Sequence, residues 1–193
     1  MSASNLIRRR ELVSALLARR EGALVVPGLG SPTWDCFAAG DSHDYLYSWG
    51  GMGLAVPTAL GVALARPERR VLALTGDGEM MMGLGSLAVV GAQAPANLAI
   101  LVLDNESFGE TGRQTGLTAA GTDLCAIARG AGIGETLAVT ALDQLDALAE
   151  LMFRAPGPAF AVAKIALTEE PWALPEKDGA VIARRFRAAL GVH

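Results

Sequence analysis

The chain has 193 residues, of which 51% are hydrophobic and 19% charged, and its formal net charge is −4. This length suits one domain with a sizeable core, and the slightly acidic balance argues against a nucleic-acid-binding protein. Charged residues recur near the amino terminus, so no signal peptide is expected, and no long apolar run predicts a membrane span. Cys36 and Cys125 lie far apart without metal-type spacing, which predicts reduced core thiols in a cytoplasmic protein.

Helical periodicity opens the chain. Leu12, Val13, Leu16 and Leu17 fall on one side of a helix. We therefore expect an amphipathic opening helix, with the arginines at 8–10 on its solvent-facing side.

A glycine-rich turn follows the first predicted strand. The strand covers 23–26, and the turn contains Gly28 and Gly30. A turn at a strand end can reach a ligand at the edge of an α/β sheet, so both glycines are candidate cofactor-binding residues. A short helix over 32–39 should follow. His43 then lies in a polar loop and, because its usual pKa is close to neutral pH, it is a candidate for proton transfer or substrate contact.

Gly50, Gly51, Met52 and Gly53 open a further predicted helix that ends at 63 or 64. A dinucleotide-binding fold, with this loop as its glycine fingerprint, is a rival interpretation. It fails because the third small position of the fingerprint is occupied by a valine. It also leaves the next motif unexplained.

Two apolar runs, 71–74 and 98–103, predict strands of a parallel sheet that is covered on both faces. A crossover helix predicted over 79–92 joins them, so both strands should end at one edge of the sheet. Polar residues and glycines follow each strand: Gly76, Asp77, Gly78 and Glu79 after the first, and Asp104 and Asn105 after the second.

This edge should suit a diphosphate that is bridged to the protein by a metal. Gly76 and Gly78 let backbone amides approach an anion closely, but the carboxylate of Asp77 would repel phosphate. A hard cation resolves the conflict, because Mg²⁺ is commonly held by one or two protein oxygens together with phosphate oxygens. Asp77 would supply a charged oxygen to this cation and Asn105 an amide oxygen.

The rest of the chain continues the alternation of strands and helices. The segment 106–116 is polar and glycine-rich, which predicts a mobile loop that orders over a ligand. Further helices are expected over 123–130, 143–154 and 179–190, and further strands over 135–139 and 158–167. We predict a single doubly wound α/β domain over 1–193, with a mainly parallel sheet and helices on both faces.

The motif at 76–78, followed by Asp104 and Asn105, resembles the diphosphate-binding signature of thiamine-diphosphate enzymes, in which Gly-Asp-Gly is usually followed by Asn-Asn. The chain departs from the signature at Asp104, where an asparagine is usual. We expect this departure to change the local geometry of the loop and not the binding of the metal. The resemblance implies Mg²⁺ ligands from Asp77, Asn105 and the Ser107 carbonyl. It also implies cofactor contacts by Gly76, Asp77, Gly78, Glu79, Asn105, Ser107, Phe108 and Gly109.

In decarboxylases of this family, a Gly-Gly-hydrophobe-Gly segment holds the cofactor in its bent shape. Gly50, Gly51, Met52 and Gly53 match that segment. The resemblance implies that Met52 is the bulky residue that supports the bend, and that the carbonyl of Gly50 accepts a hydrogen bond from the aminopyrimidine. Both residues are therefore catalytic candidates beside His43.

The sequence around both motifs looks closest to phosphonopyruvate and sulfopyruvate decarboxylases. This implies a lyase that uses thiamine diphosphate and Mg²⁺ to decarboxylate a 2-oxoacid, 3-sulfopyruvate or phosphonopyruvate. The activating glutamate of the family lies on a pyrimidine-binding domain for which this length leaves no room. A separate α-type subunit is therefore expected to supply it, in a dimer or an α₂β₂ assembly. Arg113, Gln114 and His43 are candidates for binding the second acidic group of the substrate.

Three other functions stay open. The chain could be the β subunit of a 2-oxoacid oxidoreductase; the lack of a cysteine cluster counts against this alternative but does not exclude an iron–sulfur cluster elsewhere in the enzyme. It could belong to a carboligase that uses the same cofactor. It could also be a non-catalytic cofactor-binding or scaffold subunit that keeps the pocket.

Overall fold

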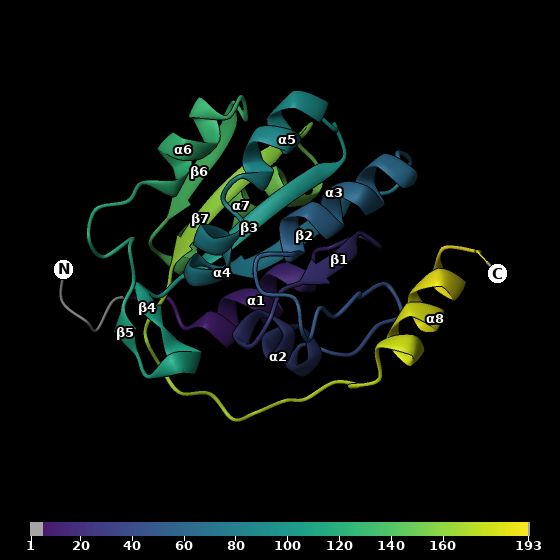
Figure 1. Cartoon of the computed structure of the whole chain (residues 1–193), viewed down its shortest axis with the longest axis horizontal. Helices are drawn as coiled ribbons and strands as arrows, with labels where there is room; N and C mark the ends of the chain where they lie inside the picture. Colours follow the sequence, from purple (N-terminus) through teal and green to yellow (C-terminus); the bar gives the residue numbers. More distant parts are fainter. Residues whose placement is uncertain (1–5, 193) are drawn as a thin grey trace.

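Five short strands pair in parallel to form the central sheet of the computed structural model, which describes residues 6–192 (Figure 1). In spatial order they are β1 (Leu24–Pro27), β2 (Val71–Gly76), β3 (Leu98–Asp104), β7 (Ala159–Lys164) and β6 (Glu135–Val139). The unbroken apolar runs of β2 and β3 make them fully buried neighbours, as predicted. The α/β fold class inferred from the sequence is confirmed.

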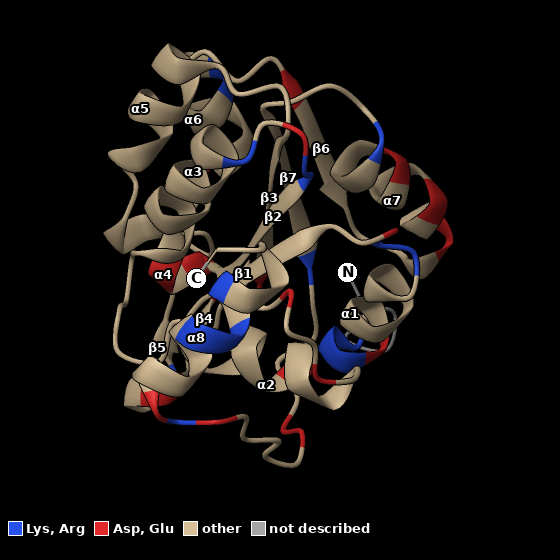
Figure 2. Ribbon diagram, turned by 90° about the vertical axis from the view of Figure 1, so that its right-hand side faces the viewer, with Lys and Arg blue, Asp and Glu red and all other residues tan. Residues whose placement is uncertain are grey.

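Alternating strand residues bury two separate cores, one on each face of the sheet. In β2, for example, Leu72 and Leu74 belong to one core and Val71 and Ala73 to the other. Helices α1 (Arg9–Leu17), α2 (Ser31–Ala38) and α7 (Leu145–Phe153) cover the first core. Helices α3 (Ala55–Ala65), α5 (Ser86–Gln93) and α6 (Leu124–Gly130) cover the second, and Figure 2 shows the helices on either side of the sheet. Both cysteines are buried and free, as expected.

The crossover between β2 and β3 differs from the single helix predicted over 79–92. It consists of α4 (Asp77–Met82) and α5, with a break at 83–85. Gly83 lies so close to Gly53 that a Cβ at position 83 would collide with the carbonyl oxygen of Gly53. The glycines that break the helix therefore bring the loop before α3 against the end of α4.

The opening helix is confirmed, but the expectation that its arginines all face solvent is wrong. The side chain of Arg9 is only 8% exposed and forms an ion pair with Asp35, whose side chain is fully buried. Arg10 binds the same carboxylate. A buried guanidinium needs such a partner, because leaving it unpaired away from water would be costly.

Two irregular stretches complete the chain. The segment 106–116, predicted as a mobile loop, contains β4 (Ser107–Phe108), the 3₁₀ helix η2 (Gly109–Thr111) and β5 (Gln114–Thr115), with β4 and β5 antiparallel. Its mobility stays a prediction. A second 3₁₀ helix, η3 (Leu142–Gln144), precedes α7, and an extended stretch leads from β7 to α8 (Gly179–Ala189) (Figure 1). Within residues 6–192, no helix has the length and apolar character to cross a membrane.

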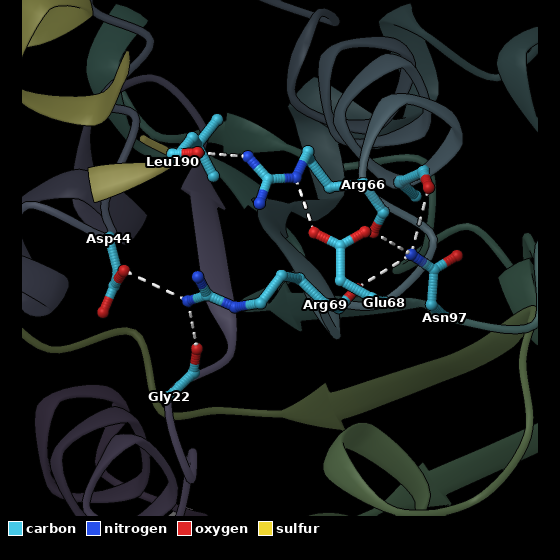
Figure 3. A network of polar contacts seen from close by, with 8 residues as sticks. Gly22, Asp44, Arg66, Glu68, Arg69, Asn97 and Leu190 are labelled. Carbon is cyan, nitrogen blue, oxygen red and sulfur yellow. Dashed lines mark hydrogen bonds and ion pairs between the residues drawn. The ribbon is translucent and has the colours of Figure 1, made fainter. Parts of the chain in front are cut away.

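Asn97 joins three turns at the amino-terminal edge of the sheet (Figure 3). Its Nδ2 atom lies 2.8–3.0 Å from the carbonyl oxygens of Ala63, Arg66 and Arg69. Arg66 in turn donates to the carbonyl of Leu190, after α8. This one amide therefore connects the end of α3 and the start of β2 to β3, while Arg66 connects them to the carboxyl terminus.

We expect Asn97→Ala to lower the free energy of unfolding by about 2–3 kcal/mol, because half-buried carbonyls would lose their donor. Urea titration measures this change. Glu68→Gln is the control, since Glu68 lies in the same network but only pairs with Arg66 at the surface. An Asn97→Ala protein as stable as the control would contradict the role assigned to the amide.

Candidate metal and diphosphate site

A cavity lies at the carboxyl ends of β2 and β3. It contains about 810 Å³ of empty space, part of which is open solvent. Its lining comes from α1, the turn after β1 and the start of α2, the loop before α3, the end of β2 with α4, the end of β3 with the segment after it, and the residue after β7. These residues are Arg9, Leu29, Ser31, Pro32, Met52, Gly76, Asp77, Gly78, Glu79, Leu103, Asn105, Ser107, Phe108, Gly109, Glu110, Thr111 and Ile165.

The register of the sheet brings the two predicted polar motifs together. Gly76 pairs with Leu103, so Asp77 and Asp104 each follow directly after paired residues. Both carboxylates are buried, at 4% and 2% exposed. The Thr118 hydroxyl lies between them, donating to Asp104 Oδ1 at 2.8 Å and lying 3.4 Å from Asp77 Oδ2.

Asp104 is well compensated, whereas Asp77 is not. The ammonium group of Lys164 lies 2.7 Å from Asp104 Oδ2, and the amide of Glu106 donates to Asp104 Oδ1. Burial and then the charge of Asp104 raise the pKa of Asp77 to about 6, although nearby backbone amides oppose this shift. Asp77 is therefore a buried acid that an added cation would stabilise in its charged form.

A tight turn after β3 presents Asn105 at the cavity. The amide of Ser107 donates to Asn105 Oδ1 at 3.0 Å, and Glu106 between them adopts a left-handed conformation with φ of 60°. A side-chain amide oxygen has two lone pairs, so this bond leaves Asn105 Oδ1 able to bind a cation. Ser107 itself is buried and lines the same cavity.

Gly78 is a position where a larger residue would not fit. A Cβ there would lie 2.8 Å from the ring of Phe108 and 4.0 Å from the methyl group of Met52. Met52 lines the cavity although 39% of it is exposed. The glycine therefore lets the ring of Phe108 pack directly against the turn that carries Asp77.

Glu79 is the second buried acid of the cavity. Thr75 donates to its Oε2 at 2.8 Å, while Oε1 is buried without a hydrogen bond among the described residues. Burial raises the pKa of Glu79, and the backbone amides of Ala55, Gly53 and Leu29 partly oppose that rise. The side chain thus lies against the start of α3 and the turn after β1.

The cavity contains most, but not all, of the predicted site residues. Met52, Gly76, Asp77, Gly78, Glu79, Asn105, Ser107, Phe108 and Gly109 line it. Gly28 and Gly30 do not, and instead leave room for carboxylates: a Cβ at either position would overlap Glu79 or Glu110. Gly50 and Gly51 also lie outside the lining.

His43 is not brought to the cavity. It is exposed, and its neighbour Asp44 accepts a hydrogen bond from Val25 near the start of β1 and pairs with Arg69 just before β2. These contacts place His43 at the opposite edge of the sheet from Asp77. The structure therefore gives no support for a catalytic role of this histidine.

Several residues that line the cavity were not predicted from the sequence to belong to the site: Arg9, Leu29, Ser31, Pro32, Leu103, Glu110, Thr111 and Ile165. Ser31 and Pro32 follow the glycine turn directly, and that turn was the available signal for them. Arg9 lies more than sixty residues before the metal motif, and no local pattern links it to the site.

The donor set suits a hard cation rather than a soft one. Within residues 6–192 no cluster of three or more His, Cys, Asp or Glu side chains could hold a metal. The predicted set instead has one carboxylate, one amide oxygen and one backbone carbonyl, and such oxygen donors suit Mg²⁺ when phosphate completes the coordination. The fold and these donors define a class of domain: an α/β domain that binds ligands at the carboxyl ends of its strands.

Comparison with known proteins identifies the family. Residues 33–163 match the model of the thiamine pyrophosphate enzyme, C-terminal TPP binding domain. The chain is 41% identical over 172 residues to phosphonopyruvate decarboxylase from Streptomyces viridochromogenes, spanning 86% of this chain and 42% of that protein. The chain therefore belongs to the thiamine pyrophosphate enzymes, and the matching part is the domain that binds the cofactor.

Two further comparisons describe how much of each relative is covered. Sulfopyruvate decarboxylase subunit beta from Methanothermobacter thermautotrophicus is 39% identical over 56% of this chain and 58% of its own length. The subunit of the same name from Methanococcus maripaludis is 32% identical over 82% of this chain and 84% of its own length. An X-ray structure described as a thiamin diphosphate-dependent enzyme from Mycobacterium smegmatis has a TM-score of 0.72 at 24% identity, over 84% of this chain and 32% of that one. This last likeness supports the fold.

The residues of the cavity fit the cofactor and its metal. Asp77 is a buried acid whose pKa is raised by burial and by the charge of Asp104, and a bound Mg²⁺ would favour its charged form. Gly78 and Phe108, which pack closely on each other, both line the same cavity. Asp77, Asn105 and Ser107 are thus the residues that would hold the metal.

We expect Asp77→Asn to stabilise the metal-free protein at neutral pH. Its folded-state pKa of about 6 lies above the unfolded value, so the charged form is disfavoured by the fold. The resulting destabilisation is fully present above pH 6 and fades as pH falls through the range between the two pKa values. Urea unfolding should show a gain of about 1–3 kcal/mol at pH 7.5 and a smaller gain at pH 4.5.

Asp146→Asn on α7 is the control, because that side chain is 91% exposed. The control should show no comparable gain at either pH. A loss of stability in Asp77→Asn at pH 7.5 would mean that the carboxylate is already compensated in the metal-free fold.

Proposed function

We propose that this chain is the β-type subunit of a two-chain enzyme that decarboxylates a 2-oxoacid, 3-sulfopyruvate or phosphonopyruvate, with thiamine diphosphate and Mg²⁺. The observation that carries the proposal is that one cavity gathers Asp77, Asn105 and Met52, the metal-binding oxygens and the apolar support for the cofactor. The names of the two kinds of relative supply the substrate class.

The metal and the diphosphate would bind at the ends of β2 and β3. Asp77, Asn105 and the carbonyl of Ser107 hold Mg²⁺ in this proposal. Residues of the turn after β2 and of the segment after β3 contact the diphosphate: Gly76, Gly78, Glu79, Phe108 and Gly109. When bound, thiamine diphosphate supplies the electron sink that the loss of CO₂ from a 2-oxoacid requires.

The protein itself orients the cofactor and excludes water. Met52 offers an apolar surface at the mouth of the cavity, and Gly50 the backbone carbonyl for the aminopyrimidine. The buried carboxylate of Glu79 lies near the amides of Gly53 and Ala55, beside the loop that carries Met52. The segment 106–116 covers the diphosphate end as a mobile loop in this proposal.

An α-type subunit would complete the site with the activating glutamate. Apolar side chains are exposed close to the cavity: Met52 at 39%, Leu54 at 52% and Met82 at 67%. Gly53 packs on Gly83, so these three side chains lie around one contact. Such a rim suits burial under a partner, and a dimer or an α₂β₂ assembly in the cytoplasm is the form we propose.

We expect Asp77→Ala to abolish Mg²⁺-dependent binding of thiamine diphosphate to the assembled protein, because the charged ligand of the metal is lost. Isothermal calorimetry, with and without Mg²⁺, measures the affinity. Glu135→Gln removes an exposed carboxylate of β6 and should leave binding unchanged. Unchanged affinity in Asp77→Ala would refute the assignment of the metal site.

Product analysis tests the reaction. The assembled protein should release CO₂ from 3-sulfopyruvate or phosphonopyruvate much faster than from pyruvate. Carbon–carbon bond formation would instead indicate a carboligase, and reduction of an added electron acceptor an oxidoreductase. Cofactor binding without turnover of any 2-oxoacid would indicate a non-catalytic subunit.

A further inference from the structure

The cavity has one cationic side chain among its described lining residues. Arg9 is the only Lys, Arg or His among the described residues that line the cavity, whereas Asp77, Glu79 and Glu110 are acids. Its side chain is only 8% exposed, so its charge is poorly screened by solvent. A buried guanidinium that faces a ligand cavity is well suited to bind an anionic group.

The position of Arg9 follows from how α1 is attached to the sheet. Ile7 bridges to Ile165 just after β7, and the amide of Ile165 donates to the carbonyl of Asp104 at 3.0 Å. The first residue of α1 is therefore held at the carboxyl ends of β3 and β7. This is the same edge of the sheet at which Asn105 enters the cavity.

The charge of Arg9 is only partly neutralised. Asp35 accepts hydrogen bonds from Nε and Nη2 of Arg9, and from Nε of Arg10 at 3.0 Å. Two guanidinium groups thus share one carboxylate, which leaves the cluster with a formal charge of +1. Arg10 is further held by the carbonyl of Pro171. Because a guanidinium has five N–H donors, Arg9 retains donors beyond those that bind Asp35.

The chemistry of decarboxylation indicates which anion would meet this cation. A 2-oxoacid with a second acidic group carries one carboxylate that leaves as CO₂ and one anion that stays. A cation beside the departing carboxylate would stabilise the ground state more than the transition state, in which that charge disperses. A cation beside the retained anion stabilises both states and contributes binding and selectivity.

We propose that Arg9 binds the sulfonate or phosphonate group of the substrate and so determines specificity. This inference rests on the proposed decarboxylase function. It replaces the candidates from the sequence, because none of them lines the cavity. Arg113 is 55% exposed and pairs with Glu169, while Gln114 and His43 are exposed.

Arg9→Gln in the assembled, cofactor-loaded protein tests this assignment. We expect kcat/KM for 3-sulfopyruvate or phosphonopyruvate to fall by about 100-fold or more, because a charged partner is lost in a site of low exposure. The slower turnover of pyruvate, which lacks a second acidic group, should change by less than about threefold. Arg8→Gln is the matched control, since Arg8 lies beside Arg9 but is 65% exposed, outside the cavity and paired with Glu170.

A binding measurement separates this proposal from the proposed reaction. Sulfoacetate carries a sulfonate but no ketone, so calorimetry with it reports anion binding without turnover. We expect Arg9→Gln to weaken sulfoacetate binding at least tenfold and to leave the affinity for thiamine diphosphate unchanged. Arg9→Lys, which keeps a positive charge beside Asp35, should recover part of the binding even if Arg9→Gln folds poorly.

Three results would overturn the proposal. The first is that Arg9→Gln loses activity equally on pyruvate and on the anionic substrate. The second is that Arg9→Gln loses affinity for thiamine diphosphate, which would assign Arg9 to the diphosphate. The third is that sulfoacetate does not bind to the wild type, or binds equally well to Arg9→Gln. If the wild type binds sulfoacetate through Arg9 but decarboxylates nothing, the proposed reaction fails while the anion site stands.

Discussion

The parallel pairing of β2 with β3 is the constraint on which the site depends. Because Gly76 lies opposite Leu103, the residues that follow them reach the same edge of the sheet, although they are separated by a crossover of more than twenty residues. Asp77 and Asp104 are thereby buried beside each other. Asp104 forms an ion pair with Lys164. Asp77 has only hydrogen bonds from backbone amides and from Thr118 to favour its charged form. This deficit of positive charge is the reason for which we propose a cation site at this edge.

The aspartate that departs from the usual family signature has a clear structural role. Asp104 accepts hydrogen bonds from the Thr118 hydroxyl and from the amide of Glu106, and it pairs with Lys164. It thereby holds the turn that presents Asn105. An asparagine in the same place would not form the ion pair with Lys164. The substitution therefore alters the support of the metal site, while the amide that would bind the metal is kept.

Local patterns were enough to predict the sheet and the gathering of Asp77 and Asn105 at one edge of it, because buried parallel strands read as apolar runs and the motif residues follow them directly. Contacts between distant segments were not predictable. The break after α4 depends on Gly83 packing against Gly53, and the burial of Arg9 depends on Asp35, 26 positions away. His43 shortly precedes the proposed cofactor motif at 50–53 in the sequence. It lies, however, at the amino-terminal edge of the sheet, and the residues after it run alongside β1 towards the other edge. Sequence proximity was misleading there.

Anomalous diffraction from crystals of the assembled protein, with thiamine diphosphate and with Mn²⁺ in place of Mg²⁺, would locate both the metal and the diphosphate. We expect one manganese peak at the ends of β2 and β3, within about 2.0–2.4 Å of an Asp77 carboxylate oxygen, Asn105 Oδ1 and the Ser107 carbonyl oxygen. A diphosphate bound elsewhere, or a manganese ion not bound by Asp77, would contradict it.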